Sequence, residues 1–97
     1  MKPFKELDPL LHSQLRLAVV SVLAGVKEAE FNYLKEVTAS TAGNLSVQLT
    51  KLKDAGYITI EKSFRDNYPL TQCRLTSKGR KAFSDYVDAL QQYINRK

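Results

Sequence analysis

The sequence predicts an α+β fold, mostly α, in which two short helices and a β-hairpin lie between two longer terminal helices. Residues 31–56 hold two apolar-periodic segments that are joined by the turn Thr38-Ala39-Ser40 and stopped at Gly56. Two helices joined in this way form a helix-turn-helix unit. Residues 57–75 then hold two strand-like segments around a basic, polar tip. A helix-turn-helix followed by a basic hairpin is a winged helix-turn-helix, here with a long C-terminal helix.

Length and composition limit the classes of protein that this chain can belong to. The 97 residues suffice for one domain, which we expect to span residues 1–97. A single cysteine, Cys73, and a single histidine, His12, predict no internal disulfide, no metal site and no cofactor. Neither a membrane-spanning apolar run nor a signal peptide is recognisable, so we expect an intracellular protein without membrane contacts. No catalytic constellation is present, and we expect no enzyme.

Positive charge is concentrated in one part of the chain. The 15 Lys and Arg residues exceed the 10 Asp and Glu residues, which gives a net charge of +5 and a pI near 9.4. Between residues 57 and 81 the only acids are Glu61 and Asp66, against the bases Lys62, Arg65, Arg74, Lys78, Arg80 and Lys81. A basic edge of this kind attracts polyanions and suits contact with DNA.

The first helix is expected over residues 9–24. Asp8-Pro9 is a helix-start signal, because Asp caps free amides and Pro suits the first helical position. Apolar residues fall on more than one face of this segment, so more than one face must be buried. Gly25 ends the helix, and residues 27–30 are expected to add a brief strand beside the hairpin.

The helix-turn-helix is expected to direct two sets of apolar side chains inward. Phe31, Leu34 and Val37 share one face of the first helix. The second helix, from Thr41 to Ala55, faces inward with Leu45, Leu49 and Leu52. Hydroxyl groups of Thr38, Ser40 and Thr41 are available to cap it, and Gly56 supplies a left-handed stop.

The hairpin and the last helix follow from alternation and capping signals. Ile58 and Ile60 alternate with polar residues, as a half-buried strand requires. Arg65-Asp66-Asn67 is expected to form the tip, and Pro69 is confined to an edge or loop position. Thr76 is expected to cap a final helix over residues 77–94.

Small polar residues dominate the outward side of the second helix of the helix-turn-helix. Amides such as Asn44 and Gln48 can read adenine edges, and Val47 can pack on a thymine methyl. The tip of the hairpin can reach a minor groove, where Arg is favoured. Two alternatives stay open: a merely solvated helix face, and a charged strand edge that blocks aggregation. The residues predicted to contact DNA are Ser40, Thr41, Gly43, Asn44, Ser46, Val47, Gln48, Lys51, Lys62, Arg65, Asn67 and Arg74.

The terminal helices predict a homodimer. A helix over residues 77–94 is roughly 27 Å long, so its distal apolar strip would extend beyond a body this small and be exposed. Packing helices 9–24 and 77–94 of two chains about a two-fold axis buries that strip and presents two DNA-reading helices to half-sites about 10 base pairs apart. The alternative is a last helix folded back over its own core. The predicted interface residues are Leu10, Leu17, Val20, Tyr86, Leu90, Tyr93 and Ile94.

Several motifs carry a resemblance that spans about residues 7–90: Phe31-Asn-Tyr-Leu34, Gly43-Asn-Leu-Ser46, Ala55-Gly-Tyr-Ile58, Pro69-Leu-Thr71 and Arg74-Leu-Thr-Ser-Lys-Gly79-Arg80. With them the chain resembles the small single-domain winged-helix transcriptional regulators related to the MarR and ArsR types of archaea and bacteria. The resemblance implies a cytoplasmic prokaryotic protein that binds specific double-stranded DNA as a homodimer, with Asn44, Ser46 and Val47 at the DNA.

We further infer repression by occupation of a promoter. The metal-binding clusters of ArsR-type members are absent, and any small-molecule effector would have to bind in the dimer cleft. The alternative function is that of a winged-helix protein-interaction module without specific DNA binding.

Overall fold

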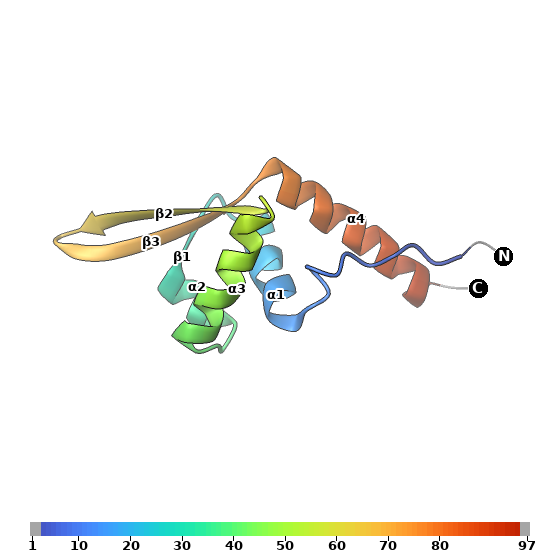
Figure 1. The fold of residues 1–97 in the computed structure, drawn as a ribbon, viewed down its shortest axis with the longest axis horizontal. Helices are drawn as coiled ribbons and strands as arrows, with labels where there is room; N and C mark the ends of the chain where they lie inside the picture. The colour runs from blue at the N-terminus through green and yellow to red at the C-terminus, as the bar shows by residue number, and fades with distance from the viewer. Residues whose placement is uncertain (1–2, 96–97) are drawn as a thin grey trace.

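The computed structural model describes residues 3–95 and has the elements of a winged helix (Figure 1). Helices α1, α2 and α3 form a body, and the β2–β3 hairpin and α4 project from it in opposite directions, so that the molecule measures 59 × 25 × 21 Å. The elements are α1 (Gln14–Ala24), β1 (Ala29–Glu30), α2 (Phe31–Val37), α3 (Ala42–Asp54), β2 (Ile58–Arg65), β3 (Tyr68–Leu75) and α4 (Ser77–Ile94).

The core lies where the three helices of the body meet the base of the hairpin. The inward direction predicted for Leu45, Leu49 and Leu52 of α3 is confirmed, because all three are buried. Helix α2 is shorter than α3, and Leu34 is its one fully buried residue. The predicted inward direction of Val37 is wrong, because its side chain is 47% exposed. The buried apolar residues are Leu11, Val19, Val20, Leu23, Ala29, Leu34, Leu45, Leu49, Leu52, Ile58, Cys73, Tyr86 and Ala89.

The turn between α2 and α3 is closed by hydroxyl groups. Thr41 is the N-cap of α3, and its Oγ1 accepts a hydrogen bond of 3.1 Å from the Asn44 amide. Thr38 instead donates to the Leu34 carbonyl at 2.6 Å and contacts Ser40 Oγ at 2.8 Å. Gly56, with φ +81°, supplies the left-handed stop expected after α3. The turn and both helices therefore form as predicted, with α3 one residue shorter at each end.

The predicted start of the first helix is wrong. Helix α1 begins at Gln14, and residues 9–11 form a turn before it. Asp8 closes that turn, since its Oδ1 accepts from the Leu10 amide at 2.9 Å. The turn places Leu11 in the core with no exposed surface. Asp-Pro fits such a turn as well as a helix start, and burial of Leu11 selects the turn.

The sheet has the order β1–β3–β2, with antiparallel pairs, and the brief strand expected within residues 27–30 is β1. Asp66 and Asn67 have φ of 51° and 68°, as a two-residue hairpin turn of type I′ requires. Pro69 pairs with Phe64 on one side and lies beyond the two pairs that β1 makes with β3. It thus has an edge position locally, as expected, although β3 is the central strand.

Helix α4 spans the predicted residues and is fixed to the base of the hairpin by a glycine. The Thr76 hydroxyl caps it by accepting a hydrogen bond of 3.0 Å from the Gly79 amide. Gly79 is buried, and a Cβ added there would lie 2.1 Å from the Tyr57 carbonyl oxygen. Only glycine permits this approach of α4 to the chain between α3 and β2.

The N-terminal segment runs along the far part of α4 (Figure 1). The Phe4 ring stacks on Tyr93 with centroids 4.4 Å apart, and the Lys5 amide donates to Gln92 Oε1 at 2.8 Å. The Tyr93 hydroxyl donates to the Lys5 carbonyl at 3.3 Å. The chain itself thus covers part of the strip that the sequence predicts to be covered by a second copy.

Two residues predicted for the dimer interface belong to the core of one chain. Val20 is fully buried and Tyr86 is 4% exposed, with its hydroxyl 3.0 Å from His12 Nδ1. Their assignment to an interface is wrong, because the first turns of α4 pack on α1 within the same chain. Leu10, Leu17 and Leu90 pack half-buried against this core, whereas Tyr93 and Ile94 are 45% and 67% exposed.

Candidate nucleic-acid interface

The outward side of α3 is small, polar and free of acidic residues until Asp54 at its end. Val47 is 52% exposed in the middle of this side. Gly43 has no atom within 4 Å of a Cβ built on it, so a flat surface could approach the helix closely at this point. The predicted α3 contacts that the structure exposes on this side are Thr41, Gly43, Asn44, Ser46, Val47 and Lys51.

Gln48 differs from its neighbours, because its amide is engaged within the protein. It is half-buried, and the Arg16 guanidinium of α1 donates a short hydrogen bond to its Oε1. Its Nε2 in turn donates to Asn44 Oδ1 at 3.1 Å. Arg16 is itself fixed by donation to the Leu10 carbonyl at 2.6 Å. Gln48 is therefore suited to orienting Asn44, while Asn44 itself remains exposed.

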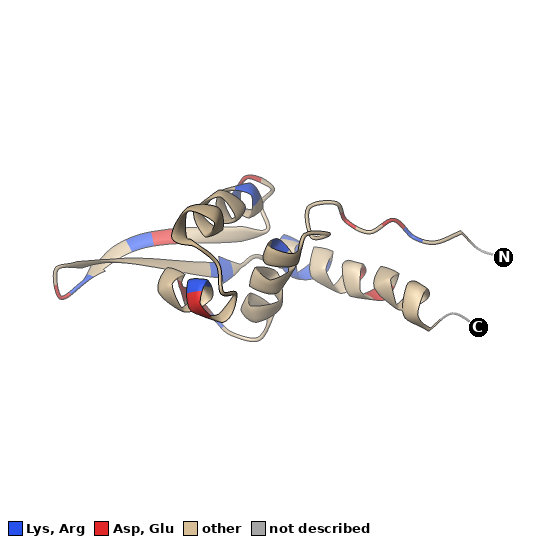
Figure 2. Ribbon diagram, turned by 90° about the horizontal axis from the view of Figure 1, so that it is seen from below, with Lys and Arg blue, Asp and Glu red and all other residues tan. Residues whose placement is uncertain are grey.

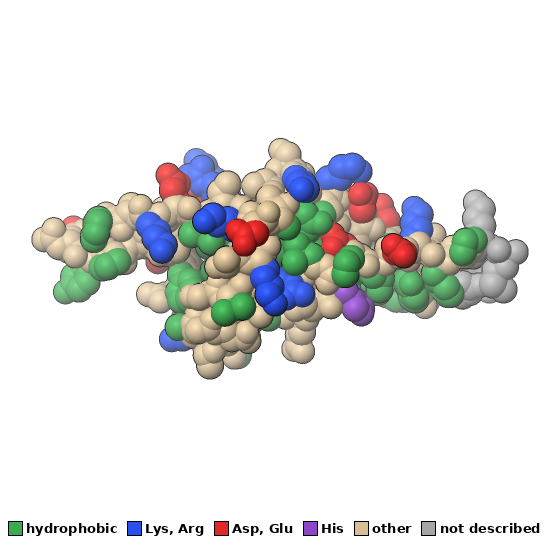
Figure 3. All heavy atoms as spheres, in the orientation of Figure 1, with side chains coloured by type: hydrophobic (Ala, Val, Ile, Leu, Met, Phe, Trp, Pro, Cys, Tyr) green, Lys and Arg blue, Asp and Glu red, His purple; other side chains and the backbone are tan. Residues whose placement is uncertain are grey.

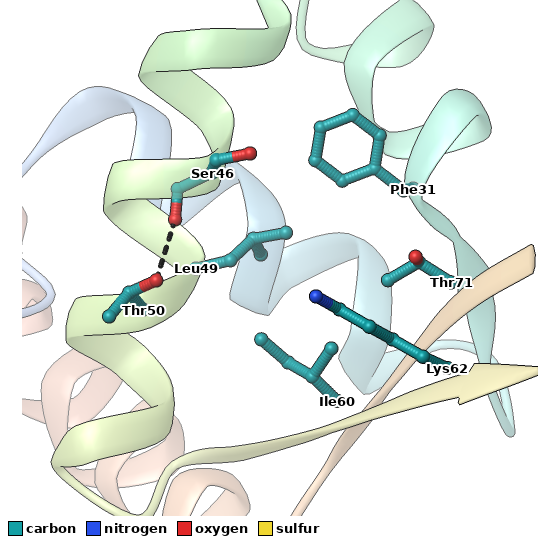
Figure 4. A pocket seen from close by; sticks show the side chains of 7 residues that line it. All are labelled: Phe31, Ser46, Leu49, Thr50, Ile60, Lys62 and Thr71. Carbon is teal, nitrogen blue, oxygen red and sulfur yellow. Dashed lines mark hydrogen bonds between the residues drawn. The ribbon is translucent and has the colours of Figure 1, made fainter. Parts of the chain in front are cut away.

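The wing, residues 57–75, meets α3 at a notch of about 340 Å³ (Figure 4). Lys62 extends into the notch from β2, toward the α3 side that carries Ser46 and Thr50. The Thr50 hydroxyl donates to the Ser46 carbonyl at 3.0 Å. No ion pair within residues 3–95 involves Lys62. The notch combines this unpaired cation with hydroxyl groups over an apolar floor, and it is lined by Phe31, Ser46, Leu49, Thr50, Ile60, Lys62 and Thr71.

Two arginines predicted to contact DNA are paired with acids around β1. Arg65 lies 2.8 Å from Glu30, and Arg74 lies 2.7 Å from Glu28, which also accepts a short hydrogen bond from Gln72. Figure 2 shows that the wing itself carries both basic and acidic residues. Exposed pairs of this kind contribute about 0–1 kcal/mol each. A phosphate can therefore replace the carboxylate partner at small cost.

Sequence reasoning did not identify several of these features. Glu28 and Glu30 become partners of the wing only because β1 pairs with β3, which a two-residue strand signals weakly. Phe64 and Tyr68, 76% and 75% exposed at the end of the wing, were also missed. The alternation Ile58, Ile60, Lys62, Phe64 along β2 was the signal that could have identified Phe64, since it shows which face of the wing carries this ring.

The groups with shifted pKa values lie away from the outward side of α3. Burial, followed by a hydrogen bond to Asp8, raises the pKa of Tyr57 from 10.0 to about 12. Burial alone raises the pKa of the Cys73 thiol to about 11, in keeping with its place in the core. Both groups are neutral at pH 7, so neither adds charge to the interface. Within residues 3–95 no group of three or more His, Cys, Asp or Glu is placed to hold a metal ion.

The segment that contains α3 and the wing matches a known family of DNA-binding domains. Residues 15–94 match the family model described as a winged helix DNA-binding domain. The chain belongs to this family. A curated relative from Methanocaldococcus jannaschii, an uncharacterized protein, is 37% identical over 78 residues, which are 80% of this chain and 85% of the relative.

Solved structures with the same winged helix fold include transcriptional regulators. A transcriptional regulator homologue from Pyrococcus horikoshii superimposes with a TM-score of 0.83 at 24% identity, over 89% of this chain and 85% of that one. A MarR-family regulator from Silicibacter pomeroyi superimposes with a TM-score of 0.69 at 17% identity, over 90% of this chain and 57% of that one. The resemblance to MarR-type proteins predicted from the sequence is thus confirmed for the fold of this winged helix domain.

Between residues 3 and 95, no helix of the domain is both long and apolar enough to span a membrane.

Proposed function

We propose that this winged helix domain is a sequence-specific double-stranded DNA-binding transcriptional repressor that acts as a homodimer in the cytoplasm of a prokaryote. One observation carries the proposal: the exposed side of α3 continues without an acidic residue into the notch that holds the unpaired Lys62. A convex polar helix beside a cation fits a major groove flanked by a phosphate backbone.

Within this proposal, α3 reads bases. Asn44 projects from the first turn of the helix and is oriented by Gln48, and its amide has the donor and acceptor that an adenine edge requires. Val47 lies one residue before Gln48 on the open side and can pack on a thymine methyl. Replacing Asn44 or Val47 by alanine should change the preferred sequence more than the affinity for random DNA.

Within the same proposal, lysines and arginines of α3 and the wing bind the phosphate backbone. Lys51 and Lys62 are available at once, whereas Arg65 first leaves Glu30 and Arg74 first leaves Glu28. Asn67, exposed at the hairpin turn, can add a neutral contact at the minor groove. Because backbone contacts carry no sequence information, removing Lys62 should weaken binding to all duplexes alike.

The proposed dimer buries the end of α4. Tyr93 and Ile94 are 45% and 67% exposed there, and Val87, about two turns earlier on the face of Ile94, is 37% exposed. Together with Phe4, itself 44% exposed, they form an apolar strip that a second copy related by a two-fold axis would cover. The two α3 helices would then meet half-sites about one helical turn apart. A small-molecule effector, if one exists, would act in the cleft between the two copies.

The proposal is tested by selecting duplexes from a random pool with the purified protein and sequencing those retained. We expect an inverted repeat with half-site centres about 10 base pairs apart. With the selected duplex, Lys62→Ala should weaken binding about tenfold. The matched control Lys81→Ala, whose ammonium pairs with Asp85 on α4 at 3.1 Å, should leave affinity unchanged. A pool that shows no enrichment would contradict the proposal and favour a protein-interaction module.

A further inference from the structure

The free end of the wing carries two exposed aromatic rings. Phe64 near the end of β2 and Tyr68 at the start of β3 are 76% and 75% exposed, and Figure 3 shows apolar side chains gathered at this end of the molecule, next to basic ones. Exposed rings at the end of a basic hairpin are unfavourable in water unless a partner covers them. The two rings nevertheless differ in the face of the hairpin to which they belong.

The pairing of β2 with β3 settles these faces. Side chains alternate along a strand, so Phe64 lies on the face that carries Ile60 and Lys62. Ile60 packs against the core, and Lys62 lines the notch beside α3. Tyr68 pairs with Arg65 and belongs to the opposite face. Only Phe64 therefore continues the surface that runs from α3 through the notch.

The wing holds Phe64 at a fixed place on that surface. It lies two residues beyond Lys62, about 7 Å further along the strand. Its cross-strand neighbour is Pro69, whose ring fixes φ and stiffens the strand. The two-residue turn at Asp66 and Asn67 closes the hairpin immediately beyond. The backbone that carries the ring is therefore ordered before binding, so the ordering cost falls on the Phe64 side-chain torsions.

We propose that Phe64 enters the minor groove of the bound duplex and acts as an apolar wedge between two base pairs. The inference rests on the proposed function. A duplex seated on α3, with a phosphate at Lys62, presents its next minor groove to the end of the wing. Lys62, which shares the face of the ring and lies two residues before it, complements a phosphate backbone that borders this groove. An inserted phenyl ring partly unstacks one base step and kinks the duplex toward the major groove.

The experiment uses the full chain and a fluorescently end-labelled duplex selected by the wild-type protein. Energy transfer between the ends measures the bend, and anisotropy measures affinity. Phe64→Ala should reduce the bend and weaken binding roughly 5- to 100-fold, as expected for loss of one aromatic stacking contact. The slope of affinity against salt should stay unchanged, because no phosphate contact is lost. Phe64→Leu, which keeps an apolar wedge, should retain most of the bend.

Tyr68→Ala is the matched control, because it removes an equally exposed ring from the opposite face. We expect it to bend and bind the duplex as the wild type does. Equal losses for Phe64→Ala and Tyr68→Ala, or an unbent duplex in the wild-type complex, would overturn the wedge while leaving DNA binding intact. Failure of the wild type to bind any duplex would overturn the proposed function and the wedge together. A change of oligomeric state in Phe64→Ala, measured by sedimentation, would identify the ring as a protein contact and would also overturn the wedge.

Discussion

The wing and the distal half of α4 project from opposite ends of one small body (Figure 1), and both expose large apolar side chains. Phe64 at the end of the wing is 76% exposed and Ile94 at the end of α4 is 67% exposed. The surroundings of the two residues differ. Phe64 shares its face of the wing with the cation Lys62, whereas the strip around Ile94 is lined by Phe4 and Tyr93 from the same chain.

This difference indicates different partners. An apolar strip on an amphipathic helix is buried best by an equally apolar surface, for which a second copy is the simplest source. An aromatic ring on the same face as an unpaired cation suits a partner that offers both negative charge and flat rings to stack on, as a nucleic acid does. Exposure alone would have assigned both ends the same role. The charges around each residue separate the roles.

The largest expected effect on stability comes from Gly79, where α4 meets the base of the wing. Gly79→Ala should lower the free energy of unfolding by about 3 kcal/mol, since the new Cβ would lie 2.1 Å from the Tyr57 carbonyl oxygen. Urea unfolding measures the loss. Gly43→Ala is the control within α3, because nothing lies within 4 Å of its Cβ, and it should raise stability by up to about 1 kcal/mol. Equal stability of the two variants would show that α4 does not depend on this close approach.

Introducing a negative charge at the end of α4 tests whether the apolar strip there forms a dimer interface. Ile94→Glu should raise the dimer dissociation constant at least about tenfold, because burial of an isoleucine side chain is worth roughly 1.5–3 kcal/mol and each dimer contains two copies. Sedimentation equilibrium measures this constant. Gln91→Glu, which adds the same charge at an exposed polar site of α4, should change it little. A wild-type protein that is monomeric at every concentration would assign the strip another partner.

The ion pairs of the wing predict a smaller effect in the opposite direction. Glu30→Gln should strengthen duplex binding by a few-fold, because it releases Arg65 from a pair worth about 0–1 kcal/mol. Asp88→Asn on α4 alters the net charge equally and serves as the control in the same anisotropy titration. If both variants bind the duplex more tightly by the same factor, the increase in affinity comes from net charge, and Arg65 does not contact the duplex.

The smallest expected effect concerns pH. Because the pKa of Tyr57 is raised to about 12 by burial and by its bond to Asp8, the folded state favours the neutral phenol. Its contribution to stability is complete below pH 10 and is lost as pH rises toward 12. Tyr57→Phe should be less stable than the wild type by about 1 kcal/mol at pH 8. Between pH 10 and 12 this variant should lose less stability than the wild type does. Thermal unfolding measured with Tyr33→Phe as the control, an exposed tyrosine of α2, tests this; equal pH profiles for the two variants would contradict it.

Local signals predicted most of the fold. The inward leucines of α3, the stop at Gly56 and the cap at Thr76 depend on residues close in sequence, and all are found. The start of α1 was mispredicted, because Asp8-Pro9 is compatible with a turn that only the burial of Leu11 selects.

Features that depend on contacts between distant segments were not predictable from the sequence. Val20 and Tyr86 looked like interface residues until α4 was seen to pack on α1. The pairing of Arg65 and Arg74 with Glu30 and Glu28 requires β1 to lie against β3. The sequence therefore predicts the candidate interface on α3 and the wing, but it could not show which of the cations there are already paired.

The salt dependence of duplex affinity is the most direct test of the claim that α3 and the wing lie on a DNA backbone. Lys51, Lys62 and one of the two acid-paired arginines of each copy give about six phosphate contacts per dimer. These contacts predict that the logarithm of the association constant falls against the logarithm of the salt concentration with a slope near −5. Lys62→Ala should reduce that slope by about 2, one contact for each copy. A slope near zero, or no binding at low salt, would contradict the account.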